Sequence, residues 1–253
     1  MSTVLITGAG SGFGKGAALA LAARGHDVIA TTETQQQAEA LRVEAPQLRV
    51  EVLDITTDDI AKVDDWPIDV LIDNAGAGQF GPLAEVPLEI VRHLFEVNVF
   101  GTLAITQRVL AGMIPRRSGR VIIVSSVAGL VAAPAIGPYS MTKHALQAMG
   151  IAMRAELAPL GIDVCLLNPG PYDTGFNDRM AAAMWEWFGE DSLQAETTDT
   201  FELVRDFITV DQLDPAEVVA AMVELVEADT TAEINLVPPD ALGPVDAAVE
   251  SQG

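Results

Sequence analysis

Residues 4–14 read Val-Leu-Ile-Thr-Gly-Ala-Gly-Ser-Gly-Phe-Gly, and this stretch decides the fold. A short aliphatic run passes directly into a turn that contains four glycines. Glycines let the chain turn sharply and let a diphosphate approach backbone N–H groups at the start of a helix, where the dipole favours anions. The spacing from Gly8 is G-x-x-x-G-x-G, whereas the common dinucleotide fingerprint is G-x-G-x-x-G. Taken alone, the stretch is compatible with a nucleotide-binding turn or with an ordinary tight turn.

The alternation of strands and helices continues along the chain. Short apolar runs of strand length lie at 3–7, 27–31, 49–53, 68–72, 120–125, 162–167 and 233–237. Between them lie helical stretches at 13–24, 87–112, 138–160 and 214–227. Most strand runs are apolar on consecutive residues, which is typical of strands buried on both faces. We therefore predict one domain over residues 1–253, a Rossmann-like α/β fold with a doubly wound parallel sheet of about seven strands and helices on both faces.

Two local features refine this prediction. The last helix is expected to begin with Asp214 as N-cap, Pro215 at the first helical position and Glu217 three residues after the cap. Residues 171–212 interrupt the alternation, because they contain helical patches but no strand. Long irregular insertions are usually functional, so we expect this segment to contribute to a site.

The composition excludes several classes of protein. The chain has 36 Asp and Glu residues against 14 Lys and Arg residues, a formal net charge of −22, and 49% apolar residues. The apolar content argues against disorder, and the shortage of basic clusters argues against nucleic-acid binding. We find no apolar span of about 18 residues and no signal peptide, and we expect a cytoplasmic protein without a membrane partner.

Cysteine and histidine offer no metal site. Cys165 is the only cysteine and lies in an apolar run, which is typical of a core residue. We assign structural or solvated roles to His26, His93 and His144, and no spacing of His, Asp and Glu suggests a metal ligand set.

Two further motifs accompany the glycine-rich turn. Asn74-Ala75-Gly76 follows the fourth predicted strand, and Tyr139-Ser140-Met141-Thr142-Lys143 lies on a predicted helix. Together with the T-G-x-x-x-G-x-G pattern of residues 7–14, they resemble the short-chain dehydrogenase/reductase family in order and spacing. The resemblance covers essentially the whole chain, and it implies an NAD(P)-dependent oxidoreductase.

Tyr139 and Lys143 have the chemistry that carbonyl reduction requires. They lie four residues apart on the predicted helix and therefore share one face. A phenol can give a proton to a carbonyl oxygen as hydride reaches the carbon, and a neighbouring ammonium lowers the phenol's pKa. Ser125 and Ser126 end the fifth strand, where a hydroxyl could hold the substrate oxygen. The alternatives are a surface Tyr–Lys pair and two serines that finish a strand.

The resemblance selects among these side chains. In the family the catalytic Ser precedes the Tyr by thirteen residues, which points to Ser126, and the family's helix Asn matches Asn98, which would support a proton relay to the Lys. A purely structural Asn98 is the alternative. The expected catalytic residues are therefore Asn98, Ser126, Tyr139 and Lys143.

The resemblance also implies cofactor contacts. The glycines would line the diphosphate, Asp54 and Ile55 would flank the adenine unless Asp54 is a strand-end cap, and Thr174 and Tyr172 would lie near the nicotinamide. The expected cofactor-binding residues are Gly8, Ser11, Gly12, Phe13, Gly14, Glu33, Asp54, Ile55, Asn74, Ala75, Gly76, Tyr139, Lys143, Pro169, Gly170 and Thr174.

Glu33 decides the choice of nicotinamide cofactor. It follows the second strand, where a carboxylate can accept hydrogen bonds from a ribose 2′-OH and repels a 2′-phosphate. Family members that prefer NAD more often carry Asp one residue earlier, at the position of Thr32, and Glu33 could instead be a solvated loop residue. The sequence favours NAD, with NADP as the weaker candidate.

In the family that the chain resembles, the segment after the Pro-Gly motif covers the substrate. Here that segment is residues 171–212, which we call the covering segment. Met180, Met184, Trp187 and Phe188 form an apolar stripe at helical spacing, which could line a pocket or pack on the core or on another subunit. Residues 173–240 hold 17 acidic and two basic residues, a net charge of −15, which disfavours anionic substrates and acidic carrier proteins.

These features predict an alcohol dehydrogenase or ketone reductase for a neutral, fairly apolar small molecule. An NADPH-dependent ketone or 3-oxoacyl reductase is the alternative enzyme, and a non-catalytic dinucleotide-binding regulatory protein is the alternative of another class. The resemblance further implies a homodimer or homotetramer, formed through helices 87–112 and 138–160.

Overall fold

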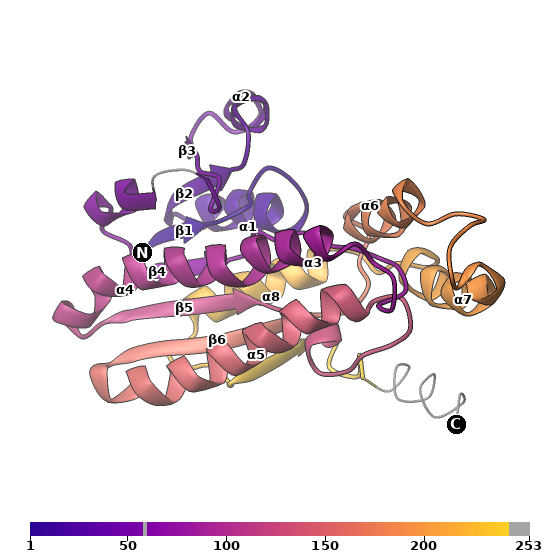
Figure 1. Ribbon diagram of the computed structural model, residues 1–253. Helices are drawn as coiled ribbons and strands as arrows, with labels where there is room; N and C mark the ends of the chain where they lie inside the picture. The colour runs from indigo at the N-terminus through magenta and orange to yellow at the C-terminus, as the bar shows by residue number, and fades with distance from the viewer. Residues whose placement is uncertain (58–59, 243–253) are drawn as a thin grey trace.

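The computed structural model describes residues 1–57 and 60–242, and a parallel sheet of seven strands lies at its centre (Figure 1). The strands are β1 (Thr3–Ile6), β2 (Asp27–Thr32), β3 (Arg49–Val52), β4 (Val70–Asp73), β5 (Gly119–Val124), β6 (Ile162–Pro169) and β7 (Ile234–Val237). Their order in the sheet is β3-β2-β1-β4-β5-β6-β7. The chain changes direction across the sheet between β1 and β4, and the loops that follow these two strands diverge and leave a crevice at their carboxyl ends. The predicted Rossmann-like fold is confirmed.

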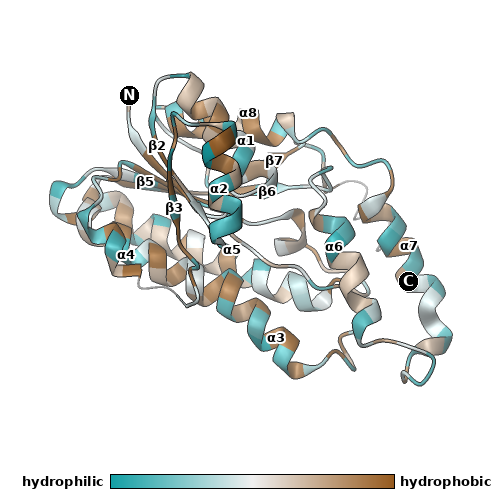
Figure 2. Ribbon diagram, turned by 90° about the horizontal axis from the view of Figure 1, so that it is seen from above, coloured by the Kyte–Doolittle hydropathy of each residue, from teal (hydrophilic) through white to brown (hydrophobic). Residues whose placement is uncertain are grey.

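Helices cover both faces of the sheet (Figure 2). The first face carries α1 (Gly12–Ala23), α2 (Gln35–Glu44) and α8 (Ala216–Glu227), and the second carries α3 (Leu88–Phe95), α4 (Thr102–Arg116) and α5 (Gly137–Leu157). Successive residues of β1 serve opposite faces: Val4 and Ile6 pack with the first group of helices, whereas Leu5 packs with the second. This double burial explains why the strand sequences are apolar without alternation.

The helical run over residues 88–116 differs from its prediction in two ways. It contains a π-helical segment, η2 (Glu96–Gly101), between α3 and α4. Its 29 residues are also long and apolar enough to cross a membrane by length and composition, which the sequence analysis did not expect. In the structure, 44% of its apolar stretch is buried, and Thr106 on α4 contacts Asp73 of β4. This packing is that of a core helix lying on the sheet.

Helix α2 is absent from the predicted helices. Only Ala38 and Leu41 are buried in it, so its apolar stripe is too weak to stand out in the sequence. The signal that could have found it is a capping box, in which the Thr34 side chain accepts from the backbone N–H of Gln37 and the Gln37 side chain accepts from that of Thr34.

Helix α8 begins one or two residues later than predicted. The Asp214 carboxylate does accept from the backbone N–H of Ala216, at 2.9 Å. Glu217 does not complete the capping box, however, because its carboxylate accepts instead from the hydroxyl of Tyr172, at 2.7 Å.

The insertion over residues 171–212 lies at the carboxyl end of the sheet, where α6 and α7 project beyond the strands (Figure 1). It contains α6 (Phe176–Ala182), η5 (Ala183–Glu186), η6 (Ala195–Thr197) and α7 (Thr198–Thr209). Three short 3₁₀ segments elsewhere are η1 (Ile60–Asp65), η3 (Val127–Gly129) and η4 (Ala158–Leu160). Residues 243–253 lie outside the described residues, so the assignment of one domain to residues 1–253 stays a prediction.

Candidate active site

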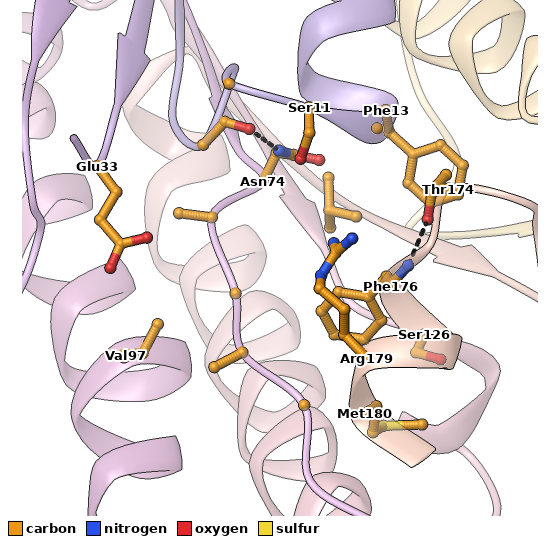
Figure 3. Close-up of a pocket in the computed structure, with 18 of the residues that line it drawn as sticks. Ser11, Phe13, Glu33, Asn74, Val97, Ser126, Thr174, Phe176, Arg179 and Met180 are labelled. Carbon is orange, nitrogen blue, oxygen red and sulfur yellow. Dashed lines mark hydrogen bonds between the residues drawn. The ribbon is translucent and has the colours of Figure 1, made fainter. Parts of the chain in front are cut away.

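A cavity of about 920 Å³ opens at the carboxyl ends of the strands, between the glycine-rich turn and α6 (Figure 3). It collects most of the side chains that the sequence analysis assigned to a cofactor or to catalysis. The predicted residues on its wall are Gly8, Ser11, Gly12, Phe13, Glu33, Asp54, Ile55, Asn74, Ala75, Gly76, Ser126, Tyr139, Lys143, Pro169, Gly170 and Thr174. Gly14 and Asn98 are the two predicted residues that do not line it.

The glycine-rich turn is held in place by the end of β4. The Thr7 hydroxyl accepts from the backbone N–H groups of Asn74 and Ala75, and the Asn74 side chain donates to the carbonyls of Thr7 and Gly8, all within about 3.1 Å. Gly8 has a φ of +66°, and a Cβ there would lie 2.8 Å from Ala75 Cα. The turn therefore needs glycine at this position for both conformation and space.

Gly14 does not line the cavity and serves packing, so its place at the diphosphate stays a prediction. A Cβ on Gly14 would lie 2.4 Å from Asn74 Nδ2 and 2.6 Å from the carbonyl oxygen of Gly8. The first turn of α1 thus lies directly against the backbone of the preceding loop. Gly12, with a φ of +55°, does face the cavity, and its missing Cβ would lie 3.4 Å from Thr174 Cβ.

One end of the cavity, where the resemblance places the adenosine of a cofactor, is bordered by the residues that follow β2 and β3. Glu33 is exposed at its edge, and no ion pair is found for it within the described part of the chain. The nearest cation in sequence to the glycine-rich turn, Lys15, forms an ion pair with Glu44 at 2.6 Å. Asp54 accepts hydrogen bonds from Thr56 and Thr57 at 2.6–2.8 Å. Partial burial raises the pKa of Asp54, but these hydrogen bonds outweigh it and the pKa lies below its ordinary value. Its carboxylate therefore caps the turn after β3, and because Asp54 also lines the cavity, its contact with an adenine stays a prediction.

Tyr139, Lys143 and Ser126 meet on the opposite wall. Tyr139 and Lys143 lie on α5, and Lys143 Nζ is 5.5 Å from the centre of the Tyr139 ring. The ammonium donates to the carbonyl of Val124 at 2.9 Å. Ser126, at the start of η3, accepts from the N–H of Ala128 at 3.1 Å and makes a longer, 3.4 Å contact to the carbonyl of Pro169.

Burial sets the protonation of this group. Burial raises the pKa of Tyr139 above its ordinary value, while a hydrogen bond with Ser126 acts in the opposite direction. Burial lowers the pKa of Lys143 to about 8. Tyr139 is 9% exposed, and Lys143 lies among the buried charged residues. The expected fall in the phenol pKa is thus opposed by burial, because a charged form is costly away from water.

Asn98 lies one layer behind the cavity, in η2. Its side chain exchanges two hydrogen bonds with the backbone of Ala77, at 2.7 and 2.8 Å, and donates to the hydroxyl of Thr142 at 2.9 Å. The side chain is fully buried. A Cβ on Gly76 would lie 3.3 Å from Asn98 Oδ1 and 3.8 Å from Lys143 Nζ, so both side chains approach the same glycine. Asn98 thereby fixes the chain segment that separates it from the cavity.

The covering segment supplies the remaining wall. Phe176 and Met180 of α6 pack on Gly78, where a Cβ would meet both side chains at about 3.0 Å. The Tyr139 ring lies 5.8 Å from the Phe176 ring. Met184 and Phe188 are buried deeper, in a cluster with Phe80 and Tyr139, whereas Trp185 is half exposed. The predicted stripe therefore both lines the cavity and packs on the core.

Comparison with known proteins identifies the family of this chain. A family model described as short chain dehydrogenase matches residues 2–185. The chain belongs to the short-chain dehydrogenase family. Among its relatives is the uncharacterized oxidoreductase YusZ of Bacillus subtilis, 39% identical over 182 residues, which are 67% of this chain and 65% of the relative. Another is the NADPH-dependent 3-dehydrocapnine reductase of Ornithobacterium rhinotracheale, 35% identical over 69% of this chain and 66% of that protein.

The whole fold is shared with solved members. A short-chain dehydrogenase from Streptomyces avermitilis has a TM-score of 0.83 and 29% identity, and the match covers 99% of this chain and 93% of that one. The matched stretches span about two thirds of the length of the two curated relatives. The chain thus belongs to a family of oxidoreductases that bind nicotinamide cofactors.

The cavity fits such a cofactor. Its volume is in the range of ligand and cofactor sites. The left-handed glycines Gly8 and Gly12 leave backbone open to a diphosphate where side chains would fill the turn. Pro169, Gly170 and Thr174 follow β6 on the far side of the same cavity. Tyr172 also borders the cavity. Its ring packs edge-on against Phe13 and its hydroxyl donates to Glu217, so the side chain has a structural role in lining the cavity.

Several wall residues escaped the sequence analysis. They are Gly10, Gln37, Leu53, Thr56, Thr57, Ala77, Gly78, His93, Val97, Val124, Phe176, Asn177 and Arg179. Most follow strands or flank a motif, where backbone position decides the lining. For Arg179 a signal did exist, since it is one of only two bases in residues 173–240.

The remaining candidates have structural surroundings. His26 lies 3.3 Å from Glu227, and His144 Nδ1 lies 2.9 Å from the carbonyl of Ser140. His93 is exposed, in agreement with a solvated role, and it lies at the edge of the cavity. Burial raises the pKa of the Cys165 thiol to about 11. Within residues 1–57 and 60–242, no group of three or more His, Cys, Asp or Glu could hold a metal ion.

Proposed function

We propose that this short-chain dehydrogenase interconverts a secondary alcohol and a ketone with NAD(H), and that its substrate is neutral and fairly apolar. The observation that carries the proposal is the meeting of Tyr139, Lys143 and Ser126 on one wall of the cavity that the glycine-rich turn opens. These side chains can move a proton at an oxygen atom placed beside them.

The bound nicotinamide supplies or takes the hydride. Tyr139 gives the proton to the carbonyl oxygen in reduction and takes it back in oxidation. Ser126 orients that oxygen, because its hydroxyl lies beside Tyr139 on the cavity wall and its 3.4 Å contact to the Pro169 carbonyl is long enough to be exchanged for a stronger acceptor. Lys143, when charged, favours the phenolate and thereby offsets the effect of burial on Tyr139. Asn98 holds the Ala77 backbone that separates it from this group.

The charges around Glu33 support NAD(H). A 2′-phosphate at this edge of the cavity would face a carboxylate that lacks an ion-pair partner in the described residues. Lys15 offers no compensation, because its ammonium is paired with Glu44. The alternative is an NADPH-dependent ketone or 3-oxoacyl reductase. It is favoured by the NADPH-dependent relative, which is a 3-dehydrocapnine reductase.

The wall of the covering segment supports an apolar substrate. Phe176 and Met180 face the cavity beside Tyr139, with Gly78 beneath them. The net charge of −15 over residues 173–240 disfavours a strongly anionic thioester or an acidic carrier protein at this opening. A ketone with an aliphatic or aromatic substituent meets both conditions.

A screen of secondary alcohols and ketones with each cofactor, followed by the absorbance of the reduced nicotinamide, tests the proposal. We expect turnover with NAD(H) on uncharged apolar substrates and weak turnover on their carboxylate counterparts. Preference for NADPH with an acyl-carrier thioester would contradict it. Tight NADH binding without turnover of any substrate would favour the non-catalytic binding protein.

The assembly into a homodimer or homotetramer is also part of the proposal. Phe100 of η2 and Met141 and Ile151 of α5 are large apolar side chains that stand 41–53% exposed on the helices assigned to the interface. Sedimentation of the wild type tests this assignment. The cytoplasmic location stays a prediction.

A further inference from the structure

The covering segment carries one cation that is free to meet a ligand. Residues 173–240 contain 17 acidic residues and only Arg179 and Arg205 as bases. Arg205 is engaged, with its guanidinium 2.7 Å from Asp206 and 3.8 Å from Glu202. For the Arg179 guanidinium, no hydrogen bond or ion pair is found within residues 1–57 and 60–242, although acids surround it in sequence.

The Arg179 side chain extends into the cavity. It leaves α6 beside Met180 and Phe176, and its guanidinium lies on the side of Ser11 and Thr174 (Figure 3). A Cβ on Gly175 would lie 2.9 Å from Arg179 Nη1, so the guanidinium lies over Gly175, next to Thr174. Thr174 in turn approaches Gly12, whose missing Cβ would lie 3.4 Å from it. The guanidinium therefore lies on the side of the cavity that the glycine-rich turn borders.

The other cations near the cavity are already engaged. Lys143 Nζ is buried and donates to the carbonyl of Val124. Lys15, beside the glycine-rich turn, is paired with Glu44. Among the residues that the structure describes, a diphosphate on this turn would find backbone N–H groups but a single unengaged cation on the cavity wall, Arg179. The planar guanidinium matches phosphate oxygens with two parallel hydrogen bonds, which makes Arg suited to this task.

We propose that Arg179 binds the diphosphate of the cofactor and thereby draws the covering segment over the bound dinucleotide. The inference rests on the proposed function only in that the ligand is a dinucleotide. It assigns to α6 a role on the cofactor side as well as on the substrate side. Cofactor binding would then order the wall formed by Phe176 and Met180 before the substrate enters.

Calorimetric titration of Arg179→Met with NADH, ADP and adenosine tests the proposal. The dissociation constants for NADH and ADP should rise by about 10- to 100-fold, the effect of losing a charge-assisted contact, whereas that for adenosine should stay within about threefold. Arg179→Lys should lie between wild type and Arg179→Met. Arg205→Met, which removes the same charge from the same segment, should bind all three like the wild type.

Hydrogen exchange of residues 171–212 gives the second measurement. NADH should protect this segment in the wild type and in Arg205→Met, and clearly less in Arg179→Met at saturating NADH. Unchanged affinity of Arg179→Met for NADH and ADP would overturn the proposal, most directly if its KM for an anionic substrate rose instead. If the wild type bound ADP but not NADH or NADPH, the proposed function would be contradicted. The ADP titration would still decide the role of Arg179.

Discussion

The two sides of the cavity are built by different means. On the cofactor side, the Asn74 side chain donates to backbone carbonyls of the turn over residues 7–14, and Gly8 and Gly14 leave no room for a Cβ. On the substrate side, the segment over residues 171–212 consists of short helices held by an apolar stripe and a few polar contacts. The first side is a backbone site, and the second is a side-chain site.

This difference explains why one side could be predicted in detail and the other only in outline. A backbone site restricts residue type at fixed spacings, so its motif is visible in the sequence. A side-chain site asks only for apolar volume, which many sequences provide. Four changes test the contrast, from the largest expected effect to the smallest.

Gly14→Ala should damage the cofactor side most. The new Cβ would meet Asn74 Nδ2 and the Gly8 carbonyl at 2.4 and 2.6 Å, so α1 must shift away from the turn. We expect a loss of about 3 kcal/mol in the free energy of unfolding, as for overpacked cores, and NADH binding weakened by about 100-fold or more. Urea denaturation and calorimetry measure both.

Gly112→Ala is the matched control. Gly112 lies in α4 with nothing within 4 Å of its Cβ position. It should gain up to about 1 kcal/mol from helix propensity and bind NADH normally. If Gly14→Ala had the same free energy of unfolding and the same affinity for NADH as the wild type, the tight contact between α1 and the turn would be refuted.

Asp73→Asn tests the buried acid at the end of β4. Asp73 is 3% exposed, and the Thr106 hydroxyl, which donates to it, lies 2.7 Å from both Asp73 Oδ2 and the carbonyl of Thr102. Burial raises the pKa of Asp73 to about 7, although the Thr106 hydrogen bond acts in the opposite direction.

The sign of the pH effect follows from this raised pKa. Between about pH 4 and pH 7 the folded state binds the proton more strongly, so the contribution of Asp73 to stability falls as pH rises through 7. The free energy of unfolding of Asp73→Asn, measured by urea denaturation relative to the wild type, should therefore rise by about 3 kcal/mol from pH 5 to pH 8. Asp173→Asn, an exposed acid, should follow the wild type. A difference independent of pH would contradict a protonated Asp73.

Glu33→Gln sharpens the assignment of the cofactor. Removing this carboxylate relieves its repulsion of a 2′-phosphate, so the ratio of NADPH to NADH dissociation constants should fall by about tenfold. Glu51→Gln, at the neighbouring β3 and paired with Arg49, is the control and should leave the ratio unchanged. If the wild type already binds NADPH more tightly, Glu33 does not select the cofactor.

Glu85→Gln should have the smallest effect, on the covering segment alone. The Glu85 carboxylate accepts from the backbone N–H groups of Leu193 and Gln194 at 2.8 and 3.0 Å. We expect hydrogen exchange near residues 189–197 to accelerate by about fivefold, corresponding to about 1 kcal/mol, with little change in global stability. Glu89→Gln, on the exposed side of α3, should change neither. Global destabilisation by Glu85→Gln would mean that the two sides unfold together.

The fold itself was predictable to within a few residues because most strands contain consecutive apolar residues, with β3 (Arg-Val-Glu-Val), at the edge of the sheet, as the clearest exception. The cofactor turn, Ser126 and the Tyr139–Lys143 face followed from spacing. Three features did not. The placement of Gly14 depends on a distance between helix and loop, the engagement of Asp54 depends on the turn of Thr56 and Thr57, and α2 buries only two apolar side chains.

Arg179 shows the limit most clearly. Its charge is visible in the sequence against an acidic background, but its direction depends on how α6 leaves Gly175. Burial likewise inverts the simplest expectation for Tyr139, because it raises the pKa of the phenol despite the hydrogen bond with Ser126, and it also lowers the pKa of Lys143.

The most direct test of the account compares NADH binding and ketone turnover in Tyr139→Phe. The account predicts an unchanged dissociation constant for NADH and a fall in turnover of about 1,000-fold, the scale of a lost general acid. Tyr172→Phe, which removes the other tyrosine hydroxyl and its contact to Glu217, should keep turnover within severalfold. Turnover retained in Tyr139→Phe with NADH still bound would contradict the assignment of the proton to Tyr139.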